Sequence, residues 1–294
     1  NVQCLGSKIL YRGIEDGHRK RYKVDYSPTL YLPSKTRTNF TTIHGNFVSE
    51  IKPGTIRDCR DFVQQYEGTE NFKIYGNQRY EYAFISEEHP NEVEWDRQFI
   101  NICNIDIEVG SENGFPDPAT ANEPIIAIAC KTNSNFTVFG YSDFNNLHHN
   151  HVQYIKCNGE IDLIKKFLAY WTADYPDIVT GWNIKFFDIP YLYNRINNLL
   201  GEESAKRLSP WNYMSERTAF IMGRHITVHT PMGVSVLDYF EMYRKYAPGG
   251  MSQENYKLDT ICHEELGERK LSYEEYGNLH TLYKEDYQKF IEYN

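Results

Sequence analysis

Cys103-Asn-Ile-Asp-Ile-Glu-Val109 alternates apolar and polar side chains, as a β-strand with two unlike faces does. The two isoleucines and Val109 are expected on one face, and Asp106 and Glu108 together on the other. At about 3.3 Å per residue, the two Cα atoms would lie roughly 6.6 Å apart, so both carboxylates can reach one divalent cation or a close pair. The pattern suggests a Mg²⁺ or Mn²⁺ site. A solvated outer face of a sheet is the alternative interpretation.

The composition is that of a globular protein, with 40% hydrophobic and 24% charged residues among 294. This length favours two domains, which we place at residues 1–100 and 101–294. The longest apolar run, residues 125–130, is too short to cross a membrane. Six scattered cysteines without a Cys-x-x-Cys pair predict reduced thiols in a cytoplasmic protein, without zinc. The net charge of −9 argues against a nucleic-acid coat protein but not against a nuclease, whose metal-binding acids add negative charge.

The first hundred residues read mainly as short strands and turns, which predicts a mixed, mostly β amino-terminal domain. Between Ser7 and Arg37 there are eight basic residues against three acidic ones, with four tyrosines among them. Such a mixture suits a groove for single-stranded DNA, and it also suits a solvated hairpin. Thr55 and Asp58 form a capping-box pattern that predicts a helix through Tyr66.

The second half predicts an α/β domain of the ribonuclease-H-like class. Residues 125–131 and 136–141 read as strands that follow the 103–109 strand in an antiparallel meander. The pattern then changes to an amphipathic helix over 160–171, a short strand over 177–182 and a helix from Pro190 to Leu200. Three antiparallel strands followed by strand–helix alternation are typical of that fold class.

The remaining residues predict a hairpin, a strand and several helices. The hairpin strands are expected at 218–222 and 226–230, with Gly223 and Arg224 at the turn. A strand over 234–237 leads to Asp238, which we expect to cap a helix through Tyr246. Helices are predicted over 258–266 and 279–293, so the sequence stops inside the last one. Since the first residue is not Met, we expect the numbered chain to begin inside a longer product.

Residues 179–191, Val-Thr-Gly-Trp-Asn-Ile-Lys-Phe-Phe-Asp-Ile-Pro-Tyr, supply another acid at a strand end. Asp188 is expected in the connection that follows the 177–182 strand, and ligand sites of open α/β sheets gather at such carboxyl ends. This position predicts that Asp188 faces Asp106 and Glu108. Capping of the following helix is the other role that the local sequence allows.

The pair Asp106-Ile-Glu108, followed by Gly181-Trp-Asn-x-x-x-Phe-Asp-x-Pro-Tyr191, resembles the first two exonuclease motifs of family B DNA polymerases. The context in Trp95-Asp-Arg97, Phe115-Pro-Asp-Pro118 and residues 233–239 resembles the branch found in tailed bacteriophages. The resemblance spans most of residues 90–294 and, more loosely, the amino-terminal region. It implies a 3′→5′ proofreading exonuclease, which acts in the host cytoplasm and hydrolyses the terminal phosphodiester of single-stranded DNA with two Mg²⁺ or Mn²⁺ ions.

The same resemblance implies the roles of the catalytic residues. Asp106, Glu108 and Asp188 would hold the metals. Tyr293 matches the tyrosine of a Tyr-x-x-x-Asp motif, whose acid would fall three residues past the end of this sequence. The isolated chain would then cleave weakly. Lys270 would lie near the scissile phosphate, unless it is an ordinary solvated lysine.

The resemblance also implies residues that contact DNA. Asn183 and Phe187 would position the terminal nucleotide, or else only pack the loop between strand and helix. The hairpin with Gly223 and Arg224 corresponds to one that the family uses to move primer ends between sites, and an ordinary surface hairpin is the alternative.

The implied partners are single-stranded DNA, primer–template DNA, the remainder of the polymerase in the same or a second chain, and a sliding clamp. No membrane partner is expected. Two other functions stay open at this stage. One is a catalytically incomplete module that binds single-stranded nucleic acid, and the other is a free-standing exonuclease of the same fold. The large amino-terminal region argues against the free-standing enzyme.

Overall fold

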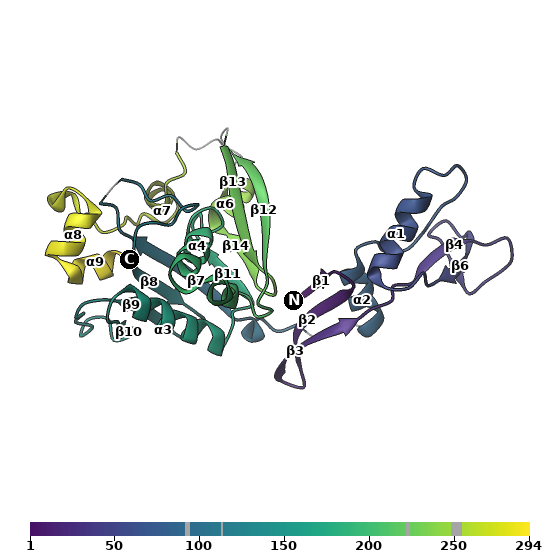
Figure 1. The fold of residues 1–294 in the computed structure, drawn as a ribbon, viewed down its shortest axis with the longest axis horizontal. Coiled ribbons are helices and arrows are strands. Elements are labelled where there is room, and N and C mark those ends of the chain that lie inside the picture. Colours follow the sequence, from purple (N-terminus) through teal and green to yellow (C-terminus); the bar gives the residue numbers. More distant parts are fainter. Residues whose placement is uncertain (92–94, 113, 222–223, 248–254) are drawn as a thin grey trace. The chain divides into compact units, whose positions relative to one another are not determined.

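A computed structural model describes residues 1–91, 95–112, 114–221, 224–247 and 255–294. The chain divides into two compact units, Asn1–Phe99 and Ile100–Asn294. Most helices and strands of the two units are labelled in Figure 1.

The first unit holds two small antiparallel sheets and two helices. One sheet has the order β1 (Val2–Leu5), β2 (Lys8–Glu15), β3 (His18–Asp25), and the other β4 (Leu30–Pro33), β6 (Phe47–Ile51), β5 (Phe40–Thr41). The predicted β-rich character is thereby confirmed, and most of the basic stretch forms the β2–β3 hairpin. The expected capping box is also present, because the Thr55 hydroxyl accepts from the Asp58 amide while Asp58 accepts from the Thr55 amide at the start of α1 (Ile56–Tyr66).

The second helix of this unit, α2 (Tyr80–Glu88), was not predicted. Tyr80 and Phe84 are buried one turn apart, whereas Tyr82 between them is exposed, so the apolar face is too narrow to give a periodic signal. A short 3₁₀ turn over Arg97–Phe99 ends the unit.

The second unit is built on a six-stranded mixed sheet. Its order is β10 (Val152–Lys156), β9 (Phe136–Gly140), β8 (Ile125–Lys131), β7 (Ile102–Val109), β11 (Ile178–Gly181), β14 (Ser235–Asp238). The predicted antiparallel meander is confirmed as β7–β8–β9, and the other neighbours pair in parallel. Together with the helices that follow, this arrangement confirms the ribonuclease-H-like α/β class.

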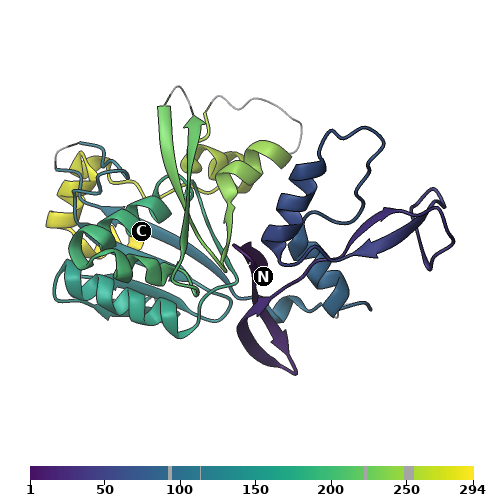
Figure 2. The same ribbon diagram turned by 45° about the vertical axis from the view of Figure 1, so that its right-hand side comes forward.

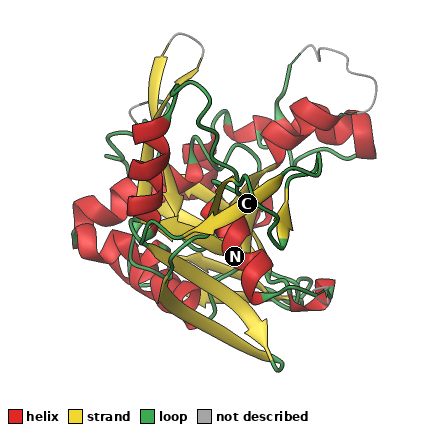
Figure 3. Cartoon of the chain, turned by 90° about the vertical axis from the view of Figure 1, so that its right-hand side faces the viewer, coloured by secondary structure: helices red, strands yellow, loops and turns green. Residues whose placement is uncertain are grey.

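Helices pack on both faces of this sheet. Figure 3 colours the helices red and the strands yellow. On one face, α3 (Glu160–Ala173) and α4 (Asp188–Leu200) pack on Ile105, Ile107 and Val109 of β7. On the other face, α8 (Leu279–Glu285) and α9 (Tyr287–Tyr293) pack on β8 and β9. The apolar and acidic faces of β7 therefore point to different helix layers.

A long hairpin and several short helices also belong to this unit. Figure 2 shows the hairpin of β12 (Met214–Ile221) and β13 (Arg224–Pro231), in green, standing out from the sheet. The short helix α5 (Glu202–Ala205) and a 3₁₀ turn over Lys206–Leu208 precede it, and α6 (Tyr239–Tyr246) and α7 (Leu258–Leu266) follow it. Within the described ranges, no helix has the length and apolarity that a membrane crossing requires.

Several boundaries differ from the sequence predictions. Arg224 pairs with Ile221 inside the hairpin strands rather than forming the turn, and Gly223 lies outside the described residues. Helix α4 begins at Asp188, two residues before Pro190, which the first turn tolerates because its amides need no helical partner. The predicted 279–293 helix is interrupted at Asp286, whose carboxylate accepts from the Lys289 amide and caps α9. Strand β10 was not predicted.

Candidate active site

Two acids project from β7 toward the face that α8 and α9 cover. Asp106 lies opposite Ala129 of β8, and Glu108 lies opposite Ala127. Directly opposed residues share one face of a sheet, so both acids have methyl groups as their cross-strand neighbours. Glu108 is only 9% exposed and Asp106 is half-buried. Small partners on β8 therefore leave room for two carboxylates inside the unit.

A third acid meets this strand from a distant part of the chain. Asp188 is the first residue of α4 and is 3% exposed. Its Oδ1 accepts a hydrogen bond of 3.1 Å from the amide of Ile107, the residue between the two acids of β7. The structure thus brings together the three acids of the two sequence motifs, although Asp188 starts the helix rather than lying in the loop before it.

Burial and mutual repulsion make ionisation of these acids costly. Burial raises the pKa of Asp106 to about 6, although the Lys270 charge and the Asn294 amide oppose the shift. Burial, followed by the Asp106 charge, raises the pKa of Glu108 to about 8. The pKa of Asp188 is raised well above its ordinary value by burial and then by the Asp106 charge. A cation placed among these oxygens would offset that cost.

The three carboxylates fit hard divalent cations, which prefer oxygen ligands. Two of them are turned toward protein partners, because Asp188 accepts from Ile107 and an Asp106 oxygen accepts from Asn294 Nδ2 at 3.2 Å. Accordingly, within the described part of the chain, no three His, Cys, Asp or Glu side chains already converge as a metal cage. The donor chemistry therefore fits Mg²⁺ or Mn²⁺, and binding would require the carboxylates to turn.

Lys270 and Tyr293 lie together beside the acids. The Lys270 Nζ is 3.5 Å from the Tyr293 hydroxyl and 4.7 Å from the centre of its ring. Burial by itself would lower the pKa of Lys270, but Tyr293, Asp106 and Glu108 raise it on balance. Burial is the main cause that raises the pKa of Tyr293. A protonated amine and a neutral phenol therefore border the acidic cluster.

The loop between β11 and α4 presents the residues expected to contact DNA. Asn183 adopts a left-handed conformation with φ of 66°, and its carbonyl accepts from the amides of Phe186 and Phe187. The Phe187 ring lies 5.5 Å from the ring of Phe115, which is 86% exposed. Phe115 was not predicted to contact DNA. Its position beside Phe187 creates an open aromatic surface next to Asp188.

None of the described contacts joins Gly223 or Arg224 of the hairpin to the three acids. Gly223 is outside the described residues, and Arg224 is placed only as a strand residue paired with Ile221. Farther down the hairpin, the exposed ring of Phe220 lies 5.1 Å from that of His225.

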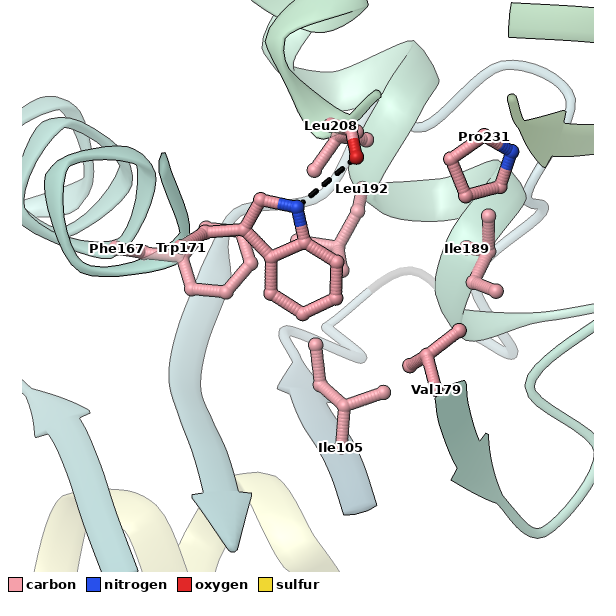
Figure 4. Close-up of a pocket in the computed structure, with 8 residues that line it drawn as sticks. All are labelled: Ile105, Phe167, Trp171, Val179, Ile189, Leu192, Leu208 and Pro231. Atoms are coloured by element: carbon pink, nitrogen blue, oxygen red, sulfur yellow. Dashed lines mark hydrogen bonds between the residues drawn. The ribbon is translucent and has the colours of Figure 1, made fainter. Parts of the chain in front are cut away.

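A small apolar cavity lies on the other side of β7 (Figure 4). Ile105 and Ile189, the neighbours of Asp106 and Asp188, line it together with Trp171. The Trp171 indole N–H donates to the Leu208 carbonyl at 2.9 Å, shown as the dashed line. Trp171, fixed by this hydrogen bond, is therefore one of the large apolar side chains that pack beneath the acids.

Comparison with known proteins shows one consistent group of relatives. Residues 51–261 match the family described as DNA polymerase family B, exonuclease domain. The DNA-directed DNA polymerase of Escherichia phage RB69 is 31% identical over 322 residues, which cover 100% of this chain and 35% of the relative. The corresponding polymerase of Enterobacteria phage T4 is 27% identical with the same coverage.

A more distant relative is the DNA polymerase catalytic subunit of Alcelaphine herpesvirus 1, which is 26% identical over 62% of this chain and 18% of its own length. The chain spans about a third of the length of the phage relatives that it matches.

Proposed function

Because this chain belongs to the exonuclease-domain family of the family B DNA polymerases, a nuclease family, we propose that it removes nucleotides from the 3′ end of single-stranded DNA. The observation that carries the proposal is the hydrogen bond from the Ile107 amide to Asp188. This bond holds an acid of the second motif against the strand that carries Asp106 and Glu108.

The chemistry requires a nucleophilic water and a counter-charge for the leaving 3′ oxygen. Two Mg²⁺ or Mn²⁺ ions supply both when bound. Asp106, Glu108 and Asp188 would hold them, since these acids offer clustered carboxylate oxygens. The Tyr293 hydroxyl, whose raised pKa keeps its proton, would orient the attacking water.

Substrate binding would use the positive and aromatic groups around the acids. The Lys270 charge would face the scissile phosphate, because a cation near the reacting centre stabilises the negative charge of the phosphate. Asn183 and Phe187 would position the terminal nucleotide, with Phe115 extending the aromatic surface for base stacking. Gly223 and Arg224 remain expected DNA contacts of the hairpin.

We propose that an acid four residues after Tyr293 completes the metal site in a longer polymerase. In this view, residues 1–100 form the amino-terminal domain and 101–294 the larger part of the exonuclease domain. The remainder of the polymerase, primer–template DNA and a sliding clamp would be its partners in the host cytoplasm. The relatives' greater length supports a larger enzyme around this chain.

Substrate polarity tests the proposal. A 5′-labelled single-stranded DNA incubated with Mg²⁺ or Mn²⁺ should shorten stepwise, whereas a 3′-labelled strand should release labelled mononucleotide from the first turnover. Release of the labelled nucleotide from the 5′-labelled strand in the first turnovers would contradict the proposed direction. An RNA strand of the same sequence should be degraded more slowly, and a preference for RNA would favour the free-standing exonuclease. Binding of DNA without shortening, even in a chain extended through the missing acid, would favour the binding module.

A further inference from the structure

A buried carboxylate outside the acidic cluster organises the loop that faces the substrate. Asp238, the last residue of β14, is 2% exposed. Its Oδ1 accepts from the amides of Phe240 at 2.9 Å and Asn183 at 3.0 Å. Its Oδ2 accepts from the amide of Lys185 at 2.9 Å. The Phe240 bond is the predicted helix cap, and the other two reach 55 and 53 residues back along the chain.

The two long-range bonds are spaced to hold the β11–α4 connection in one conformation. Asn183 and Lys185 flank Ile184, which is fully buried. Asn183 itself has positive φ, which costs free energy in a residue with a Cβ atom. A buried carboxylate needs several donors to offset its lost hydration, and here the donors are the amides of this connection. The conformation of the β11–α4 connection therefore depends on the Asp238 carboxylate, and the buried carboxylate depends on the amides of this connection as hydrogen-bond donors.

We propose that Asp238 is a positioning residue for the exonuclease reaction, one that holds Asn183 and Phe187 in place for the 3′-terminal nucleotide. This inference rests on the proposed function. Among the described contacts of Asp238 none joins it to Asp106, Glu108 or Asp188, and it acts through the amides of Asn183 and Lys185. The carbonyl of Asn183 in turn accepts from the Phe187 amide at 3.1 Å, so the arrangement extends to the aromatic ring.

The effect should fall on substrate binding rather than on the chemical step. Asp188 follows the loop directly, but its own carboxylate is anchored by Ile107 and its helix is packed on the sheet. A disturbed 183–187 loop therefore leaves the acids near their places while it displaces the nucleotide contacts. A purely structural role would instead reduce the amount of folded enzyme, which lowers the apparent kcat without changing KM.

The variant Asp238→Asn separates these outcomes, because it keeps the size of the side chain but replaces one acceptor oxygen with an NH₂ group. We expect KM for single-stranded DNA to rise by about 10-fold or more, with a smaller change in kcat, as is usual when a partner behind a site residue is removed. Hydrogen exchange of the peptide that contains residues 183–187 should become faster. The matched control is Asp58→Asn, which alters the helix cap of α1 in the first unit and should leave KM unchanged.

The outcomes distinguish the inference from the function beneath it. Both proteins are measured in the version extended through the acid after Tyr293. The positioning role is overturned if the extended chain degrades DNA and Asp238→Asn leaves KM unchanged, whether or not kcat falls. If the extended chain does not degrade DNA from its 3′ end, the proposed function fails and the inference falls with it. A raised KM together with faster exchange at residues 183–187 supports the role.

Discussion

The ion pair between Glu160 and Arg195 ties the helices α3 and α4 together beneath the candidate site. Arg195 Nε and Nη2 each lie 2.7 Å from a Glu160 oxygen, and the two side chains are 13–14% exposed. Glu160 Oε1 also accepts from the Ile125 amide at 2.7 Å. Arg195 Nη1 donates to the carbonyls of Ala121 and Asn122. The pair therefore joins two helices, the first residue of β8 and the loop before it.

Arg195→Met should destabilise the second unit by about 3–5 kcal/mol, the usual cost of leaving one member of a buried pair without its partner. In that variant, the Glu160 carboxylate keeps the Ile125 amide but loses both Arg195 donors. The Asn122 carbonyl loses the Arg195 donor, while the Ala121 carbonyl keeps a hydrogen bond from Asn198 Nδ2 at 3.5 Å. Glu160→Gln should cost less, about 1–3 kcal/mol, because the amide oxygen still accepts and Arg195 keeps both carbonyls. The double variant should cost less than the sum, since it leaves no unpaired buried charge.

Urea unfolding followed by tryptophan fluorescence measures these free energies. Three of the four tryptophans (171, 182 and 211) lie in the second unit, so the signal reports chiefly on that unit. A loss below about 1 kcal/mol for Arg195→Met, or strict additivity in the double variant, would refute the argument that this pair is buried and coupled.

Three further predictions concern single side chains. Trp171→Phe should lower the unfolding free energy by about 2–4 kcal/mol, because it enlarges the cavity and leaves the Leu208 carbonyl without its donor; a loss under about 0.5 kcal/mol in urea would contradict this. Burial lowers the pKa of His229 in the folded chain. The neutral ring therefore makes its full contribution to the free energy of unfolding above about pH 6.5, and this contribution is lost as the pH falls below that value. Thermal unfolding of His229→Gln should therefore depend less on pH between about 7.5 and 5 than that of the unmodified chain, and identical slopes would exclude this role. Lys270→Met should reduce kcat for DNA excision by about 100-fold, Lys270→Arg should retain more activity, and equal rates in all three proteins would remove Lys270 from the reaction.

Local patterns accounted for most of the elements. Alternation predicted β7, the Thr55–Asp58 pair predicted the start of α1, and Asp238 was identified as a cap. The missed elements have two causes. Strand β10 forms because β9 offers a parallel edge, which the alternation of apolar residues does not reveal. The last predicted helix breaks at a local cap, in which Asp286 accepts from the Lys289 amide, and the apolar periodicity across that position hid the break.

Some features of the candidate site could be predicted from the sequence, and others depend on the tertiary fold. Alternation alone indicated that Asp106 and Glu108 share a face, and the strand-end position of Asp188 predicted that it would meet them. The Ile107 bond that joins these motifs depends on the tertiary fold. The same holds for the ring of Phe115 beside Phe187 and for the reach of Asp238 to Asn183, since each contact spans more than fifty residues.

The most direct test of the account is metal-dependent excision by a version of this chain extended by about 40 residues of its own gene, beside the same version with Asp106→Ala. The extended chain should shorten 5′-labelled single-stranded DNA stepwise with Mg²⁺ or Mn²⁺. The folded Asp106→Ala protein should lose at least about 1,000-fold of this activity, because removing a metal-holding acid removes the source of the nucleophile. Near-normal excision by Asp106→Ala would contradict the assignment of this acidic cluster as the catalytic centre.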